Sequence, residues 1–387
     1  MHFFDFDNNL LKEKLSGERF SVSYNIRGTE AECREIAQEI CVEQSIEFPP
    51  DQVPQGEILD QIVGRIERFE FITDGLYQAE ISYAVETVSG EFTQLLNVIF
   101  GNFSIKPSVQ VVDIKLSPSL LEMFSGPQFG IAGLREIVNV DDRPLLFTAL
   151  KPMGLSSSNF GRLIGVFAEN GIDIIKDDHG LTNQSFAPFR ERVKICGEAI
   201  QNANAKTGGS SIYVPNITAP PSQLRERALL AKEHGAGGLL VAPGLVGFDA
   251  MRDLADGEIN LPIFAHPAFS GSMAVNPQGF TLQMLYGLIT RLAGADATIF
   301  PGNGGRFTFT KEECIGIAET GKKEMGSIKP IFPCPAGGMN FAKIPQMLAD
   351  YGKDVMFLIG GGLFSHSRDL VENCRYFSER VQELSGQ

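Results

Sequence analysis

The amino-acid sequence predicts an α/β fold whose C-terminal part is a (β/α)8, or TIM, barrel. Eight short apolar runs recur at roughly even spacing after residue 143, and helix-like segments lie between them. The runs are apolar throughout rather than alternating, as in parallel strands that helices cover. Eight such strands alternating with helices match a barrel, whose chemistry sits at the carboxyl ends of its strands.

The residues before the barrel predict a separate α+β domain of the ferredoxin-like type. The chain has 387 residues, 43% of them apolar, which exceeds the usual size of one domain. "FSVSYNI" and "GLYQAEISYAVETV" alternate as half-buried strands do, and "TEAECREIAQEICVEQ" has helical spacing. We expect this domain to span residues 1–124, a Gly- and Pro-rich linker to span 125–144, and the barrel to span 145–387.

The strands of the barrel follow one another in a fixed alternation with helices. In chain order the strand candidates are "PLLFTALKP", "IDIIKDD", "SIYVPNIT", "GGLLVAP", "LPIFAHP", "ATIFPG", "PIFPCPAGG" and "VMFLIGGG". The helix candidates include "SNFGRLIGVFAENG", "PSQLRERALLAKEHG", "TLQMLYGLITRLAG", "TKEECIGIAETGKKEMG" and "NFAKIPQMLADYG". Several of these helices end at glycine, the residue that most often terminates a helix.

Composition narrows the function to small-molecule chemistry. The formal net charge of −14 argues against a nucleic-acid surface, which needs clustered Lys and Arg. Six scattered cysteines suggest neither a zinc motif nor disulfides, so we expect a reducing, cytoplasmic setting. "MHFFDFDNNL" lacks a basic region before an apolar stretch, and no apolar span approaches 18 residues, so we expect neither export nor a membrane partner.

Charged residues at several strand ends mark the mouth of the barrel as the candidate site. Lys176, Asp177 and Asp178 close the second strand, and Lys151, Asn216, His266 and Phe300 follow other strands. Such groups are expensive to desolvate and must pair with each other or with ligands. A rim of salt bridges is the structural alternative.

Glycines after the last two strands predict a phosphate site. Backbone N–H groups approach an anion closely where side chains are absent, and barrels commonly bind phosphate at this position. Simple turn glycines are the alternative, which is weaker for two glycine-rich loops in succession. The residues concerned are Gly337, Gly338, Gly360, Gly361 and Gly362.

The position of Lys176 beside two aspartates leaves three interpretations open. The lysine forms a structural ion pair, a Schiff base, or part of a hard-metal site with oxygen ligands. The adjacent carboxylates favour the charged amine, which counts against a Schiff base.

At these residues the sequence resembles the ribulose-bisphosphate carboxylase large chain and its RuBisCO-like relatives. The family pattern "GRPLL…KPxLGLS…GxDFxKDDE" stands here as "DRPLLFTALKPMGLSSSNFGRLIGVFAENGIDIIKDDHG". The resemblance continues in "FSGPQFGI" (124–131), Gly101-Asn102, the strand "FAH" and the glycines at 360–362.

The resemblance implies a metal centre and a proton carrier. Lys176 would be carbamylated by CO2 and, with Asp178 and the residue at 179, would hold Mg²⁺, which prefers oxygen ligands. The bound metal would stabilise the oxyanion of an enediolate. Lys151 matches the family's proton-transferring lysine. The family also places N-terminal residues of one subunit over the barrel of another, which implies a homodimer with shared active sites to which Glu39 and Asn102 contribute.

Departures from the family pattern argue against a carboxylase. His179 replaces the third metal ligand, a glutamate, and imidazole suits Mg²⁺ poorly. Met153 stands in place of a second family lysine. Three other replacements leave only the glycine-rich phosphate site and make the distal end apolar: Pro267 for an arginine, and Ser270 and Phe300 for histidines. Arg306, in "GNGGRF", lies near the position of a CO2-stabilising lysine.

The expected function is therefore metal-dependent enolisation or isomerisation of a monophosphorylated keto sugar. A 5-methylthioribulose 1-phosphate isomerase-like activity fits best, because the diketo enolases among the relatives carry a lysine base around the position of Asn102. One alternative is decarboxylation of a phosphorylated β-keto sugar acid such as 3-oxo-isoapionate 4-phosphate, with Arg306 meeting the carboxylate. Another is a non-catalytic phosphometabolite-binding protein that lost its chemistry through His179. Asn216, Arg306 and Glu39 are the expected further substrate contacts, and His266 and Asn102 the expected catalytic partners of Lys151.

Overall fold

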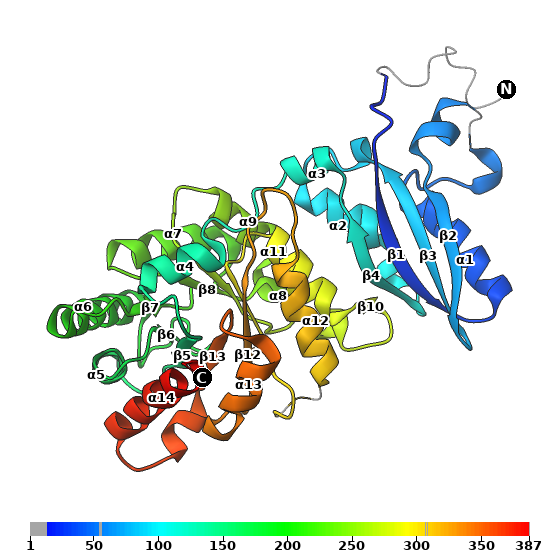
Figure 1. The fold of residues 1–387 in the computed structure, drawn as a ribbon. Helices are drawn as coiled ribbons and strands as arrows, with labels where there is room; N and C mark the ends of the chain where they lie inside the picture. Colours follow the sequence, from blue (N-terminus) through cyan, green and yellow to red (C-terminus); the bar gives the residue numbers. More distant parts are fainter. Residues whose placement is uncertain (1–13, 54–55, 306, 308, 387) are drawn as a thin grey trace. The chain divides into compact units, whose positions relative to one another are not determined.

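The computed structural model describes residues 14–53, 56–305, 307 and 309–386 (Figure 1). The N-terminal stretch "MHFFDFDNNL" and Arg306, both used above, lie outside the described residues. The chain divides into two compact units. One contains the described residues up to Phe124 together with Ser272–Leu285, and the other contains Ser125–Gly271 and the residues from Tyr286 onward.

The first unit is the predicted α+β domain. Its sheet has the strand order β10-β4-β1-β3-β2, with β1 antiparallel to both β3 and β4. The chain order β1, α1, β2, β3, α2, β4 is that of a ferredoxin-like fold. The bounds are β1 Arg19–Arg27, α1 Glu30–Glu43, β2 Arg65–Thr73, β3 Leu76–Ala84, α2 Phe92–Phe100, β4 Val109–Lys115 and β10 Gly279–Phe280, with short helical segments at Pro50–Gln52, Ile58–Ile62, Val85–Thr87, Asn102–Ile105 (η4) and Pro118–Glu122 (α3).

Helix α1 illustrates how the sequence sets these elements. Thr29 and Glu32 form a capping box, in which each side chain accepts a hydrogen bond from the other residue's backbone N–H. The helix buries Cys33, Ala37, Ile40 and Cys41. These positions recur at helical spacing and therefore form one face.

The second unit is a (β/α)8 barrel, as the sequence predicted. All eight strand candidates form strands, and every pair among them is parallel. They form two four-stranded halves, β13-β5-β6-β7 and β8-β9-β11-β12, and a bridge between Asn216 and Leu240 links β7 to β8. The bounds are β5 Leu145–Ala149, β6 Ile174–Lys176, β7 Ile212–Val214, β8 Leu239–Val241, β9 Ile263–Ala265, β11 Ala297–Pro301, β12 Phe332–Ala336 and β13 Met356–Leu358.

Helices form the outer layer around these strands (Figure 1). The segment expected to be a linker contains helix α4 (Gly130–Val138). "TLQMLYGLITRLAG" forms a π-helical segment, η5 (Gln283–Ile289), and then a short α-helix. The remaining bounds are α5 Ser157–Glu169, α6 Phe189–Thr207, α7 Pro221–Glu233, α8 Pro243–Val246, α9 Phe248–Asp256, α10 Gly271–Ala274, α11 Thr290–Leu292, α12 Lys311–Lys322, η6 Phe341–Lys343, α13 Ile344–Tyr351, η7 Gly361–Ser365 and α14 Leu370–Ser385. No helix among the described residues is long and apolar enough to cross a membrane.

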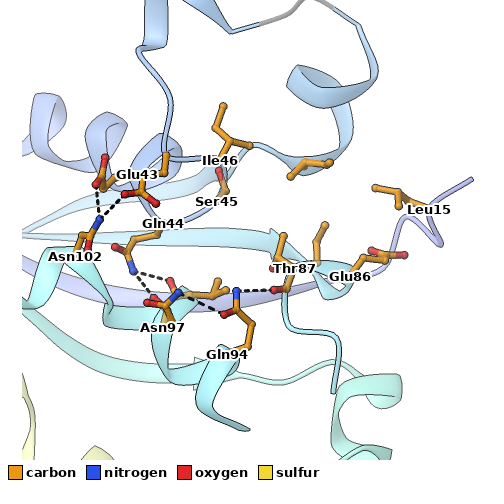
Figure 2. A pocket seen from close by; sticks show the side chains of 14 residues that line it. Leu15, Glu43, Gln44, Ser45, Ile46, Glu86, Thr87, Gln94, Asn97 and Asn102 are labelled. Carbon is orange, nitrogen blue, oxygen red and sulfur yellow. Dashed lines mark hydrogen bonds between the residues drawn. The ribbon is translucent and has the colours of Figure 1, made fainter. Parts of the chain in front are cut away.

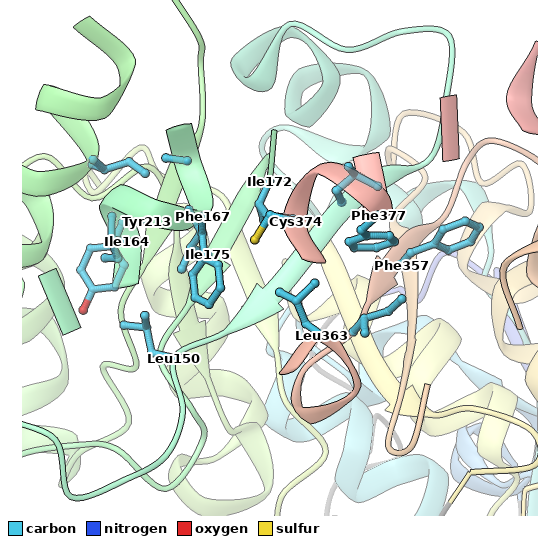
Figure 3. Packing of buried hydrophobic residues seen from close by; sticks show 14 of the residues in the cluster. Leu150, Ile164, Phe167, Ile172, Ile175, Tyr213, Phe357, Leu363, Cys374 and Phe377 are labelled. Carbon is cyan, nitrogen blue, oxygen red and sulfur yellow. The ribbon is translucent and has the colours of Figure 1, made fainter. Parts of the chain in front are cut away.

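Alternate residues of each strand pack into two different cores. Leu145, Phe147 and Ile174 belong to a cluster built from strand residues and α4, which fills the barrel interior. Leu146 and Ile175 belong to a second cluster between the strands and helices α5, α6 and α14 (Figure 3). Successive side chains of a strand point to opposite faces, so this parity determines which residues of β6 reach the interior.

A buried carboxylate anchors α4 to the strands. Asp296, 1% exposed, precedes β11 and accepts hydrogen bonds from the backbone N–H groups of Phe129 and Gly130, both at 2.7 Å, and of Ile263 at 2.8 Å. Burial raises the pKa of Asp296 to about 6, against the opposing effect of these donors.

Candidate active site

Lys176 lies inside the barrel at the end of β6. It has the same parity as Ile174, which packs in the barrel interior, and its side chain is almost fully buried. Its Nζ atom donates to the carbonyl oxygen of Asp177 at 3.1 Å. Burial lowers the pKa of Lys176 to about 8, aided by the charge of Lys151 and opposed by Asp178. A part of the amine is therefore neutral near physiological pH, the form that reacts with electrophiles.

Asp177 has the opposite parity and does not face the mouth. Its side chain is fully buried, as is that of Arg192 in α6, and the two form an ion pair at 3.1 Å. Asp177 also accepts hydrogen bonds from Tyr213 Oη at 2.9 Å and from the backbone N–H of Asn216 at 3.0 Å. We therefore assign Asp177 to structure: it joins the ends of β6 and β7 to helix α6.

Asp178 is the carboxylate that reaches the mouth. It accepts a hydrogen bond from Lys151 Nζ at 2.8 Å, and His179 Nδ1 lies 3.5 Å from the same oxygen. Burial alone would raise its pKa, but His179, Lys151 and the charge of Lys176 hold the pKa of Asp178 well below its usual range. The structure thus brings together four predicted residues, Lys151, Lys176, Asp178 and His179.

Two histidines from different strands meet face to face at this site. The rings of His179 and His266 stack with centroids 4.5 Å apart and planes 8° apart. His266 Nδ1 accepts the backbone N–H of Ala268 at 3.1 Å, so neutral His266 carries its proton on Nε2. Burial, with the charges of Lys176 and His179, lowers the pKa of His266 well below its ordinary value.

Asn216 faces the backbone of the neighbouring loop. Its Nδ2 donates to the carbonyl oxygen of His179 at 2.8 Å, and its Oδ1 accepts from the N–H of Thr218 at 3.1 Å. Both polar atoms of the amide are therefore engaged. Direct substrate contact by Asn216 stays a prediction, whereas its contact with His179 shows how that residue is held.

The glycine loops after β12 and β13 lie against the same site. Gly337 and Gly338 adopt positive φ values of 79° and 99°, which favour glycine. A Cβ atom on Gly360 would lie 3.5 Å from Lys151 Cε, so the loop after β13 borders the amine. Gly361 and Gly362 begin η7, where the first N–H groups have no acceptor within the helix.

The loop after β11 crosses the loop after β12 at very close range. A Cβ atom on Gly305 would lie 1.9 Å from the carbonyl oxygen of Gly337. The ring of Phe307 covers Gly337 from the same loop, with its Cδ2 atom 3.2 Å from where a Cβ on Gly337 would be. The predicted Arg306, between these two residues, lies outside the described part of the chain.

The predicted N-terminal contributors lie in the first unit, and there they have different partners. Glu39 pairs with Lys106. Asn102 instead donates to Glu43 Oε1 at 2.9 Å and to Glu47 Oε1 at 3.1 Å, at the edge of a cavity of about 400 Å³ (Figure 2). The sequence reasoning missed Glu43, although its spacing of four residues from Glu39 places both on one face of α1.

The donor set fits a divalent cation only on one condition. Among the described residues, no group of three His, Cys, Asp or Glu side chains could hold a metal ion. Asp178 and His179 offer two ligands, and Lys176 offers an oxygen ligand only after carbamylation. The predicted Mg²⁺ site therefore depends on carbamylation of Lys176. The lowered pKa of buried Lys176 is consistent with that modification, because the neutral amine is the form that reacts with CO2.

Comparison with known proteins agrees with this fold. A family model described as the ribulose bisphosphate carboxylase large chain, catalytic domain, matches residues 130–374. The chain belongs to the RuBisCO large-chain family.

Within the RuBisCO family the chain is similar to RuBisCO-like proteins. It is 36% identical to a 5-methylthioribulose-1-phosphate isomerase of Rhodospirillum rubrum over 94% of this chain and 96% of the relative. It is 35% identical to a 2,3-diketo-5-methylthiopentyl-1-phosphate enolase of Bacillus pumilus over 85% and 83%. The crystal structure of a Rubisco-like protein from Rhodopseudomonas palustris matches with a TM-score of 0.86 and 35% identity, covering 94% of this chain and 98% of that one.

Proposed function

We propose that this protein isomerises a monophosphorylated keto sugar of the 5-methylthioribulose 1-phosphate type by transferring a proton next to the carbonyl group. One observation carries the proposal: Lys151 lies between Asp178 and the glycine loop that contains Gly360. A phosphate bound at that loop would place the neighbouring carbon atoms of the sugar beside the amine. The substrate named for the Rhodospirillum rubrum relative has this arrangement of phosphate and ketone.

Lys151 moves the proton in this proposal. Its Nζ atom forms an ion pair with Asp178 at 2.8 Å. Its action as a base requires release from Asp178, because only the neutral amine accepts a proton. His266 follows β9 and stacks on His179, and its Nε2–H group is the proposed partner for the sugar oxygens.

Asp178, His179 and carbamylated Lys176 are the proposed ligands of Mg²⁺, with CO2 as the activator. The ion would stabilise negative charge on the oxygens of the deprotonated sugar. The residues of this chain then have separate roles: Asp177 fixes the strand end, Asn216 holds the loop of His179, and the glycines receive the phosphate.

We also propose that a second subunit supplies Asn102 and a glutamate to the site. The active form would then be a homodimer. Because Asn102 bonds to Glu43 and not to Glu39, we propose Glu43 in addition as a contributor.

Enolisation of a diketo methylthio phosphate is the second candidate function. The Bacillus pumilus relative bears that name, and Lys106 caps the same short helical segment, η4, that Asn102 begins.

Proton exchange in D2O, followed by NMR, tests the proposal directly. We expect the protein with Mg²⁺ and CO2 to exchange a C–H proton of 5-methylthioribulose 1-phosphate, and Lys151→Ala to lose this exchange while it retains phosphate binding. Lys206→Ala is the matched control, because Lys206 forms an exposed ion pair with Glu169 on the outside of the barrel. Exchange of only the diketo compound would favour the second candidate, and binding without any exchange would favour a non-catalytic protein.

A further inference from the structure

Phe269 adopts a backbone conformation that aromatic residues rarely tolerate. Its φ is 68°, in the left-handed region, and the residue is 72% exposed. A bulky residue in this region is a steric outlier that persists only where surrounding structure forces it, and such outliers gather at functional sites. Burial of the ring does not compensate this strain, because the ring is mostly exposed.

The neighbours of Phe269 hold its backbone from several sides. The N–H of Ser270 donates to the carbonyl oxygen of Pro267 at 3.2 Å, which closes a turn with Phe269 at its third position. Ser270 Oγ donates to the same oxygen at 2.8 Å and lies 3.2 Å from Tyr286 Oη. The third position of such turns favours Gly or Asn when φ is positive, and here Phe occupies it.

Two further contacts fix the turn relative to the candidate site. The N–H of Ala268 binds His266 Nδ1, so the turn begins directly at the histidine that stacks on His179. Helix α8, which follows β8, also approaches so closely that a Cβ on Gly244 would lie 2.7 Å from the carbonyl oxygen of Ala268. The chain therefore holds the Phe269 backbone in place beside the site residues.

Phe269 and Lys151 follow strands that lie on opposite sides of the barrel. Phe269 follows β9, the fifth of the eight barrel strands, and Lys151 follows β5, the first. In a closed eight-stranded barrel these two strands lie opposite each other. Because Gly360 borders Lys151, the phosphate end of a substrate would lie on the Lys151 side, and the other end would extend toward β9.

The turn after β9 offers that end an apolar surface. Residues 267–270 are Pro, Ala, Phe and Ser, with no charged side chain. We propose that Phe269 is a specificity-determining residue, which contacts the non-phosphorylated end of the substrate and selects an apolar substituent such as a methylthio group. Thioether sulfur makes favourable contacts with aromatic rings, whereas a hydroxyl group gains little there. This inference rests on the proposed function and specifies its substrate class.

Binding measurements separate this role from catalysis. We compare the affinities for 5-methylthioribulose 1-phosphate and for ribulose 1-phosphate, in which a hydroxyl group replaces the methylthio group, by calorimetry. The wild type should prefer the methylthio compound, and Phe269→Gly should reduce that preference about tenfold, the order expected for one apolar contact. Binding of ribulose 1-phosphate should change less than twofold.

Phe269→Ala and Leu245→Ala serve as matched variants. Glycine relieves the left-handed strain and alanine does not, so only Phe269→Gly should raise the Tm, while both variants should lose the preference equally. Leu245, exposed in helix α8 after β8, should affect neither affinity. An unchanged preference in both Phe269 variants, or an equal loss for both sugars, would overturn the inference.

The D2O exchange assay keeps this test independent of the proposed function. Exchange in the wild type with unchanged affinity ratios in the variants would refute the role of Phe269 and leave the isomerase proposal standing. Loss of the affinity ratio without exchange in any form would support Phe269 as the selecting residue and refute the isomerase. A variant that dissociates into single chains with an unchanged ratio would also overturn the inference, because it would assign Phe269 to an interface between subunits.

Discussion

Replacing Asp177 by asparagine should destabilise the fold, whereas replacing its neighbour Asp178 should mainly reduce activity. Asp177→Asn leaves the fully buried guanidinium of Arg192 without a counter-charge, since their side chains are both 0% exposed. Breaking a buried ion pair from one side costs about 3–5 kcal/mol. Asp178→Asn weakens its pairs with Lys151 and His179, whose side chains are 37% and 51% exposed, and such partly exposed pairs contribute about 1 kcal/mol or less each.

Urea denaturation followed by circular dichroism measures both effects, and the D2O exchange assay measures activity. We expect Asp177→Asn to lose about 4 kcal/mol of the free energy of unfolding. We expect Asp178→Asn to stay close to the wild type in stability while it loses proton exchange. If the two variants differed by less than about 1 kcal/mol, the assignment of Asp177 to structure by strand parity would be wrong.

Three further predictions address the metal and the pH dependence. Lys176→Ala should abolish activation by CO2 and Mg²⁺ while the barrel stays folded; strong residual activity would eliminate the proposed metal site. His179→Glu should tighten Mg²⁺ binding about tenfold, or ~1.4 kcal/mol, in calorimetric titrations under saturating CO2; equal or weaker binding would show that the imidazole itself is required. Asp296, whose pKa is about 6 in the folded chain, holds its proton more tightly there than in the unfolded chain. Its contribution to stability should therefore fall by ~3 kcal/mol as pH rises from about 3 to 7. The stability difference between wild type and Asp296→Asn, measured in urea at several pH values, should show this fall, and a constant difference would mean that the carboxylate is ionised throughout.

The sequence was sufficient to predict the barrel and the gathering of Lys151, Asp178 and His179 at its mouth. Apolar strands fix where the backbone runs, and polar residues such as Lys151 and Asp178 at the strand ends must then lie at one mouth. The same alternation also indicates that Asp177 points outward, but only once the interior face of β6 is known. Arg192, its partner, lies on a different element, and no local pattern identifies it.

Other features depend on contacts that are distant in the sequence. The preference of Asn102 for Glu43 over Glu39 is set by how η4 packs on α1, and the sequence reasoning named only Glu39 although helical spacing places both glutamates on one face. The left-handed backbone of Phe269 contradicts its own propensity and results from Ser270, His266 and Gly244 acting together. Local sequence rules fail most at strained positions of this kind.

The close crossing of the loops after β11 and β12 has a consequence for how this chain evolves. At 1.9 Å, no side chain at Gly305 is compatible with the present course of Gly337. A mutation in one loop therefore moves the backbone of the other, which we propose binds the phosphate, and its effect depends on the residue already present there. Laboratory selection for new phosphorylated substrates should randomise residues 302–305 and 337–340 as one block, because beneficial pairs would be missed when each loop is varied alone.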